Sequence, residues 1–250
     1  MTKHSLLIGA VFAAAMALNI NARAQKKGDV QENAAAPSAL RVDGKLSEWD
    51  AARFITDEDT RLSYLISNDD RNLYLALKTT DREKVSKIIA RGITLTVNTD
   101  GKKKEGPALT FPASRLARPS GSKTTDPAGI LRERLESANE IRISGLKSIR
   151  DGGVSTANEY GIQAAAVLDS TNSYTYELAV PLTQLNLSSS VTSPLAVNIR
   201  INGIVPPKVQ AGPRSPYESM RRGGYGRPSF PEGLQPEDFW VRRTLTNKTN

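Results

Sequence analysis

Cysteine is absent from this chain of 250 residues, and histidine occurs only once, at His4. Without cysteine the chain can form no disulfide, offers no thiol nucleophile and cannot hold zinc through thiolates. Because His4 lies in the apolar N-terminal segment, the rest of the chain has no imidazole for acid–base catalysis or for a Ser-His-Asp triad. These absences predict a protein that is not an enzyme and that carries no cofactor.

Aromatic residues are also scarce, at 6% of the chain, and only two of them are tryptophans. Lysine and arginine total 34 against 26 acidic residues, which gives a net charge of +8 at pH 7. The basic residues are spread along the chain. For an exported protein this charge favours an anionic glycan or a membrane surface over nucleic acid as the partner, and the alternative is a charge that serves solubility alone.

The N-terminus has the pattern of a secretory signal peptide. Lys3 precedes an apolar run over residues 6–18, and Ala22 and Ala24 place small residues at the two positions that a signal peptidase reads. The run is too short for a membrane-spanning helix, so stable membrane insertion is not expected. We predict a signal peptide over 1–24 and a periplasmic or extracellular protein. Since no cysteine follows, it is not expected to be a lipoprotein.

Residues 25–38 have no hydrophobic periodicity and no aromatic residue, which predicts a disordered leader. Residues 39–246 are predicted to form one β-domain, and 247–250 a polar tail. Alternating apolar residues mark strands near 62–66, 73–77, 93–97, 141–143, 161–168, 173–180, 195–202 and 239–241. Asn/Asp turns at 68–71 and 169–172 indicate two hairpins.

Helix signals occur only between the strands. Asp81 and Gly92 bracket one short helix, and Asp126 followed by Pro127 begins another. A helical turn is expected at 181–185. Together these patterns predict an all-β fold, an antiparallel, jelly-roll-like β-sandwich of about nine strands with two or three short helices in the connections.

Five segments, in this order, are similar to a known family. They are Val42-Asp-Gly44 with Trp49, Asn72-Leu-Tyr-Leu-Ala76, residues 93–101, residues 176–181, and Phe239-Trp240. The set resembles carbohydrate-binding module family 9 (CBM9)-like β-sandwich domains of secreted bacterial, Bacteroidetes-like, proteins. The resemblance implies an exported, non-catalytic module that binds a glycan or a cell-envelope component. The alternative is a structural or protein-interaction domain of the periplasm or cell surface with no small-molecule ligand.

Sugar-binding members of the family clamp a terminal sugar between aromatic rings. Here Trp49 and Trp240 are the only tryptophans, and both occupy framework positions of the pattern, so we predict that both belong to the structural core. The clamp is therefore not carried over to this chain.

The segment 205–235 breaks the strand pattern, because its prolines, glycines and arginines predict a long loop. Arginine forks grip carboxylate or sulfate, and aromatic rings stack on sugar rings. The candidate ligand-binding residues are Tyr217, Arg221, Arg222, Tyr225 and Arg227. The competing interpretation is a connecting loop whose aromatic residues only pin it to the sandwich.

Three other interpretations are weaker. The acidic turns at 68–70 and 98–100 offer oxygen ligands for calcium, but Asn and Asp are also ordinary turn residues, and no metal site is predicted. Haem binding would have only Met220 as a ligand after the signal peptide. The run Asp57-Glu58-Asp59 indicates a solvated turn and not a glycosidase pair.

Overall fold

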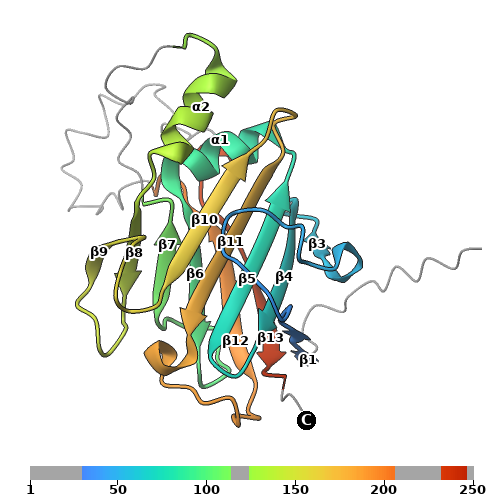
Figure 1. The fold of residues 1–250 in the computed structure, drawn as a ribbon, viewed down its shortest axis with the longest axis vertical. Helices are drawn as coiled ribbons and strands as arrows, with labels where there is room; N and C mark the ends of the chain where they lie inside the picture. Colours follow the sequence, from blue (N-terminus) through green and yellow to red (C-terminus); the bar gives the residue numbers. More distant parts are fainter. Residues whose placement is uncertain (1–29, 114–123, 206–231, 247–250) are drawn as a thin grey trace, which may run out of the picture.

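Two β-sheets face each other in the computed structural model, which describes residues 30–113, 124–205 and 232–246 (Figure 1). One sheet has seven strands in the order β1-β13-β12-β6-β7-β8-β9, and the other has six, with β10-β11-β5-β4-β2 in line and β3 also paired to β4. The predicted all-β sandwich is confirmed. Two pairings depart from the antiparallel pattern, because β1 runs parallel to β13 and β2 runs parallel to β4.

The seven-stranded sheet contains β1 (Val30–Glu32), β6 (Ile93–Asn98), β7 (Ala108–Phe111), β8 (Glu140–Ser144), β9 (Gly152–Ser155), β12 (Leu195–Ile201) and β13 (Glu237–Thr244). The six-stranded sheet contains β2 (Ala34–Ala35), β3 (Ile55–Asp57), β4 (Leu62–Asn68), β5 (Asn72–Thr79), β10 (Gln163–Leu168) and β11 (Tyr174–Pro181). Helices α1 (Arg82–Arg91) and α2 (Pro127–Glu136) lie together at one end of the sandwich (Figure 1). Three 3₁₀ turns occupy Ala51–Arg53, Leu182–Leu185 and Glu232–Leu234.

The main core lies between the two sheets and is built by strict alternation along the strands. Leu73, Leu75 and Leu77 of β5 are at most 1% exposed and pack against inward-facing residues of the other sheet, such as Leu95 and Ile199. Each such side chain contributes about 1.5–3 kcal/mol when it is fully removed from water. The alternation that predicted the strands thus also selects the face that is buried.

Capping residues begin and end the elements where the sequence predicted. The Asp81 carboxylate accepts hydrogen bonds from the backbone N–H groups of Glu83 and Lys84, at 3.0 and 3.2 Å, and Gly92 ends α1 with a φ of 80°. Asp126 accepts from the N–H of Gly129 at 2.8 Å and begins α2. The hairpins β4–β5 and β10–β11 are likewise confirmed.

The prediction of a disordered leader over 25–38 is wrong for residues 30–36. β1 and β2 extend the edges of both sheets, and Asn33 between them is 5% exposed, with its N–H 2.9 Å from the Thr244 carbonyl oxygen. These short strands form because the edges of β13 and β4 offer unpaired backbone groups. The segment has no hydrophobic period of its own, so the sequence carried no signal for them.

The described residues contain thirteen strands instead of about nine. The additional ones are short edge strands, such as β9, which no predicted strand covers. Three of the four β9 residues are exposed, so no apolar alternation marks this strand in the sequence.

A strap of residues 36–54 crosses the outer face of the six-stranded sheet (Figure 1, blue). Under it lies a second, smaller apolar cluster that consists of Ala36, Trp49, Leu65, Tyr74, Ala76 and Ala179. Strands β4, β5 and β11 are therefore buried on both faces in their central parts.

The side chain of Glu177 on β11 holds the strap in place. Its carboxylate is 1% exposed and accepts hydrogen bonds from Trp49 Nε1 at 2.6 Å and from the backbone N–H groups of Gly44 and Asp43 at 2.8 and 2.9 Å. Burial raises the pKa of Glu177 above its ordinary value, and the three donors oppose that shift. Gly44 has a φ of 83°, and a Cβ there would lie 2.9 Å from Val167 Cγ2, which explains the glycine of the Val42-Asp-Gly44 motif.

Candidate functional site

The candidate residues chosen from the long loop, Tyr217, Arg221, Arg222, Tyr225 and Arg227, all lie in 206–231, outside the described residues. The two tryptophans are described, and they differ. Trp49, on the underside of the strap, is 6% exposed and contacts Tyr74 edge to face at 6.3 Å between ring centroids.

Trp240 is half-buried, and the predicted core position does not hold for it. Its neighbours on β13, Phe239 and Val241, are each 9% exposed and belong to the main core. Since successive residues of a strand point to opposite faces, Trp240 lies on the outer face of the seven-stranded sheet. The period-two alternation of β13 in the sequence indicates an outward-facing Trp240, whereas the core prediction rests on the resemblance to a framework position.

Polar residues surround Trp240 on this face. Directly across the ladder from Trp240 lies Asn198 of β12, and across from Asn198 lies Thr96 of β6. In the next row toward one end of the strands, Arg200 of β12 lies across from Thr94 of β6. In the next row toward the other end, Ala196 of β12 lies between Arg242 of β13 and Asn98 of β6. We call the set Thr94, Thr96, Asn198, Arg200, Trp240 and Arg242 the Trp240 face.

Hydrogen bonds hold the polar side chains of this face in place. Asn198 Nδ2 donates to Asp238 Oδ2 at 2.7 Å and to the Phe239 carbonyl oxygen at 3.0 Å. The hydroxyls of Thr94 and Thr110 are 2.7 Å apart. The indole of Trp240 is thus set among ordered polar groups and is not part of an apolar cluster.

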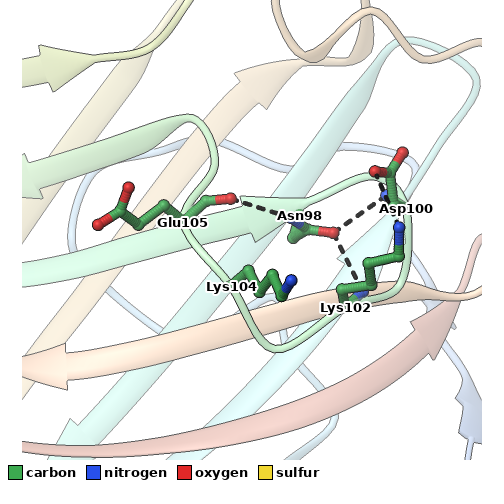
Figure 2. Close-up of a pocket in the computed structure, with 5 residues that line it drawn as sticks. All are labelled: Asn98, Asp100, Lys102, Lys104 and Glu105. Carbon is green, nitrogen blue, oxygen red and sulfur yellow. Dashed lines mark hydrogen bonds and ion pairs between the residues drawn. The ribbon is translucent and has the colours of Figure 1, made fainter.

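A shallow pocket of about 520 Å³ opens at the β6–β7 loop, next to the Trp240 face. It is lined by Asn98, Asp100, Lys102, Lys104 and Glu105 (Figure 2). Asn98 shapes the loop, since its Oδ1 accepts from the N–H groups of Asp100 and Lys102, at 3.1 and 3.0 Å, and its Nδ2 donates to the Glu105 carbonyl oxygen at 2.9 Å. Lys102 Nζ lies 3.9 Å from Asp100 Oδ2 in an exposed ion pair, and no ion pair is found for Lys104 or Glu105 among the described residues.

The pocket and the Trp240 face are continuous through Arg242. A Cβ on Gly101, at the tip of the loop, would lie 3.7 Å from Arg242 Nη2, so the loop packs beside this guanidinium. Arg242 Nε is buried and has no hydrogen-bond partner among the described residues. An aromatic ring, a guanidinium, two ammonium groups and two carboxylates therefore border one surface.

This surface has the chemistry of a binding site. Sugar rings pack their C–H faces on an indole, and their hydroxyls pair with amide, carboxylate and cationic side chains. Within 30–113, 124–205 and 232–246, no group of three or more His, Cys, Asp or Glu residues could hold a metal ion. None of the helices in those ranges is long and apolar enough to cross a membrane.

The acidic turns considered for calcium or catalysis are occupied by internal hydrogen bonds. Asp69 accepts from the N–H groups of Arg71 and Asn72, at 2.8 and 2.7 Å, and from the Tyr74 hydroxyl at 2.8 Å. Asp57 accepts from the N–H and the hydroxyl of Thr60. These contacts are those of ordinary Asx turns.

No protein-family model and no curated protein sequence matches the chain. Among solved structures, similar ones are two of a CBM9 from Caldicellulosiruptor kristjanssonii. The complex with cellotriose is 7% identical, with a TM-score of 0.39 over 88% of this chain and 96% of that one. The complex with glucose is 6% identical, with a TM-score of 0.37 over 88% and 98%. Both come from the family that the sequence resembles. The sandwich architecture is established by the two sheets described above.

Proposed function

We propose that the chain is an exported, non-catalytic module that binds a glycan or a glycan-bearing envelope component through the Trp240 face and the adjoining β6–β7 pocket. The observation that carries the proposal is the position of Trp240. It is a partly exposed indole on a polar sheet face, next to a pocket with charged walls. Indole rings in such positions supply large contact areas with little loss of side-chain entropy.

Export is supported by the N-terminal pattern of Lys3, the apolar run 6–18 and the small residues Ala22 and Ala24. A non-catalytic role is supported by the absence of cysteine and by the single histidine within that segment. N-terminal sequencing of the exported protein should give Gln25 as the first residue. An exported protein that still begins at Met1 would contradict the proposed cleavage.

The Arg/Gly/Pro loop is a second proposed contact for the same ligand. It connects β12 and β13, the strands that carry Asn198 and Trp240. Its arginines at 221, 222 and 227, with the rings of Tyr217 and Tyr225, would add charge and stacking to the Trp240 face. Tryptic cuts at Arg221 or Arg222 that disappear on adding the bound glycan would support this contact. Cuts that persist unchanged would leave the loop a connector.

The test is a glycan array followed by calorimetric titration of the best binder. Trp240→Ala should weaken binding about five- to tenfold, since one aromatic contact contributes on the order of 1 kcal/mol beyond its buried area. Arg142→Gln is the matched control, because Arg142 is exposed on β8 of the same sheet face, with three strands between β8 and β13. Its affinity should equal that of the unchanged protein.

Two outcomes contradict the proposal. If no glycan on the array binds, the structural or protein-interaction domain becomes the better interpretation. If a glycan binds equally well to Trp240→Ala, the protein binds glycans elsewhere.

A further inference from the structure

The open edge of the sandwich holds a second pocket, remote in sequence from the β6–β7 loop. Residues 30–35 pass from the edge of β13 in one sheet to the edge of β4 in the other, and a pocket of about 360 Å³ lies beside this crossing. This volume falls within the range of small-molecule sites, which begins at about 300 Å³.

Arg243 lines this pocket from the inward face of β13. It is 4% exposed, and in the ladder it lies directly beside Gln31 of β1. Its Nη1 donates to Gln31 Oε1, and the centre of its guanidinium lies 5.9 Å from the centroid of the Tyr64 ring. Its Nε has no hydrogen-bond partner in the part of the chain that the structure describes. No carboxylate of the described residues lies within ion-pair distance of Arg243.

A buried guanidinium with only neutral partners is unfavourable, since the low dielectric penalises the charge and no counter-charge offsets it. The lowered pKa of Arg243 has the same main cause, which is its burial. The other three arginines of β13 and the strap differ. Arg41 and Arg53 form ion pairs with Asp43 and Asp50, and Arg242 lies on the opposite face. Arg243 is therefore the group that an incoming anion would stabilise.

The rest of the pocket suits a small molecule with one anionic end. Gln31, Asn33 and the exposed Arg53 add polar groups on the side of Arg243. Three aliphatic side chains line the remainder, namely Ile55, Leu65 and Ile66. Glu32 is the one acid in the lining, and its Oε1 accepts from the Thr246 hydroxyl at 3.1 Å.

We propose that the edge pocket binds a uronic acid, with the sugar carboxylate on the guanidinium of Arg243 and the apolar ring face against Ile55 and Leu65. The carboxylate would accept from the Arg243 Nε–H, which has no partner among the described residues, and the exposed Arg53 would add a second positive charge. This site goes beyond the proposed glycan function, because it shares no residue with the Trp240 face or with the β6–β7 pocket.

The experiment follows the arginine Nε–H resonances of ¹⁵N-labelled protein while glucuronate or galacturonate is added. Glucose is the neutral control, inorganic sulfate is the control for a bare anion, and a short polyuronide shows whether a chain end binds as the free sugar does. The Arg243 signal is assigned by its loss in Arg243→Gln. We expect a saturable shift of this signal with a uronate and none with glucose.

Three variants separate this site from the Trp240 face. Arg243→Gln should abolish uronate binding, and Arg53→Gln should weaken it several-fold. Arg242→Gln, on the neighbouring residue of the opposite face, should leave it unchanged. Since Arg53 is exposed, its variant keeps the test valid if Arg243→Gln does not fold.

The proposal is overturned if neither uronate gives a saturable shift, if glucose shifts the signal equally, or if Arg53→Gln binds as the unchanged protein does. Saturable binding of sulfate without binding of either uronate also overturns it, because the site would then be a bare anion site. If uronates bind but no glycan binding depends on Trp240, only the Trp240 proposal has failed. If a glycan binds through Trp240 but neither uronate shifts the Arg243 signal, only the edge-pocket proposal has failed.

Discussion

The outer faces of the two sheets each carry one tryptophan, and the two residues have opposite environments. Trp49 belongs to the strap over the six-stranded sheet, is 6% exposed, and donates to a buried carboxylate. Trp240 is part of the seven-stranded sheet itself and lies half-buried among Asn198, Thr96 and Arg200. One face is closed by the chain's own N-terminal strap, and the other presents its indole among polar groups.

The residue type alone therefore does not decide whether an aromatic side chain in a sheet protein belongs to the core. What decides is whether another segment of the chain covers the face on which the ring lies. On the six-stranded sheet the neighbours Leu65, Ala76 and Ala179 are apolar and the strap covers them. On the seven-stranded sheet the corresponding positions include threonine, asparagine and arginine, and Asn198 hydrogen-bonds to Asp238 and Thr94 to Thr110.

Loss of the Trp49 ring should give the largest effect. Trp49→Ala removes a buried indole and leaves the Glu177 carboxylate without its shortest hydrogen bond, so the free energy of unfolding should fall by about 3–5 kcal/mol. Urea unfolding followed by circular dichroism measures this loss. The matched variant Trp240→Ala should lose about 1 kcal/mol or less, since its ring is only half-buried. Equal losses in the two variants would remove the distinction between the two faces.

Replacing the carboxylate that holds the strap should give the next largest effect. Glu177→Gln retains the shape of the side chain but brings an amide to a site with three N–H donors, so we expect a loss of about 1–3 kcal/mol at pH 5.

The pH dependence of that loss tests the direction of the Glu177 pKa shift. Because the pKa of Glu177 is raised on folding, the folded state binds more protons than the unfolded state at pH values from the ordinary pKa of 4.5 up to the folded pKa. The contribution of Glu177 to stability is therefore greatest below pH 4.5 and declines as pH rises through the folded value. The difference between the unchanged protein and Glu177→Gln should shrink from pH 4 to pH 7 in urea unfolding. A difference that grows with pH would show that the three donors outweigh desolvation.

A smaller effect is expected at Thr175, whose hydroxyl donates to the Gly44 carbonyl oxygen at 2.7 Å beneath the strap. Thr175→Val should reduce the free energy of unfolding by about 1 kcal/mol, the net contribution of one hydrogen bond. Thr96→Val on the Trp240 face is the control, and its change should stay within about 0.5 kcal/mol. If the control loses more than Thr175→Val, the strap is held less by its hydrogen bonds than the geometry indicates.

Acrylamide quenching of fluorescence compares the accessibility of the two indoles in the folded protein. The variant Trp49→Phe leaves Trp240 as the only indole, and Trp240→Phe leaves Trp49. We expect the Stern–Volmer slope to be steeper when Trp240 is the reporter, because its ring is partly exposed. Equal slopes would mean that Trp240 is covered in solution, and the proposed glycan site would lose its stacking surface.

Much of the fold follows from local signals in the sequence. The period-two pattern of Leu73, Leu75 and Leu77 places a strand and selects its buried face, because successive side chains point to opposite sides. Asp81 and Gly92 set the ends of α1, since a side-chain acceptor and a positive φ are needed within the same few residues. Such features need no knowledge of what lies across the molecule.

Tertiary structure alone decided the remaining features, because each depends on contacts between distant segments. The hydrogen bond from Trp49 Nε1 to the Glu177 carboxylate joins residues 128 positions apart and fixes Trp49 in the core. Strands β1 and β2 exist because β13 and β4 offer them open edges, and β1 brings Gln31 beside Arg243. The charged residue Arg243 is buried, and Trp240 stays partly exposed, because the packing of whole sheets, and not local propensity, determines which faces lose contact with water.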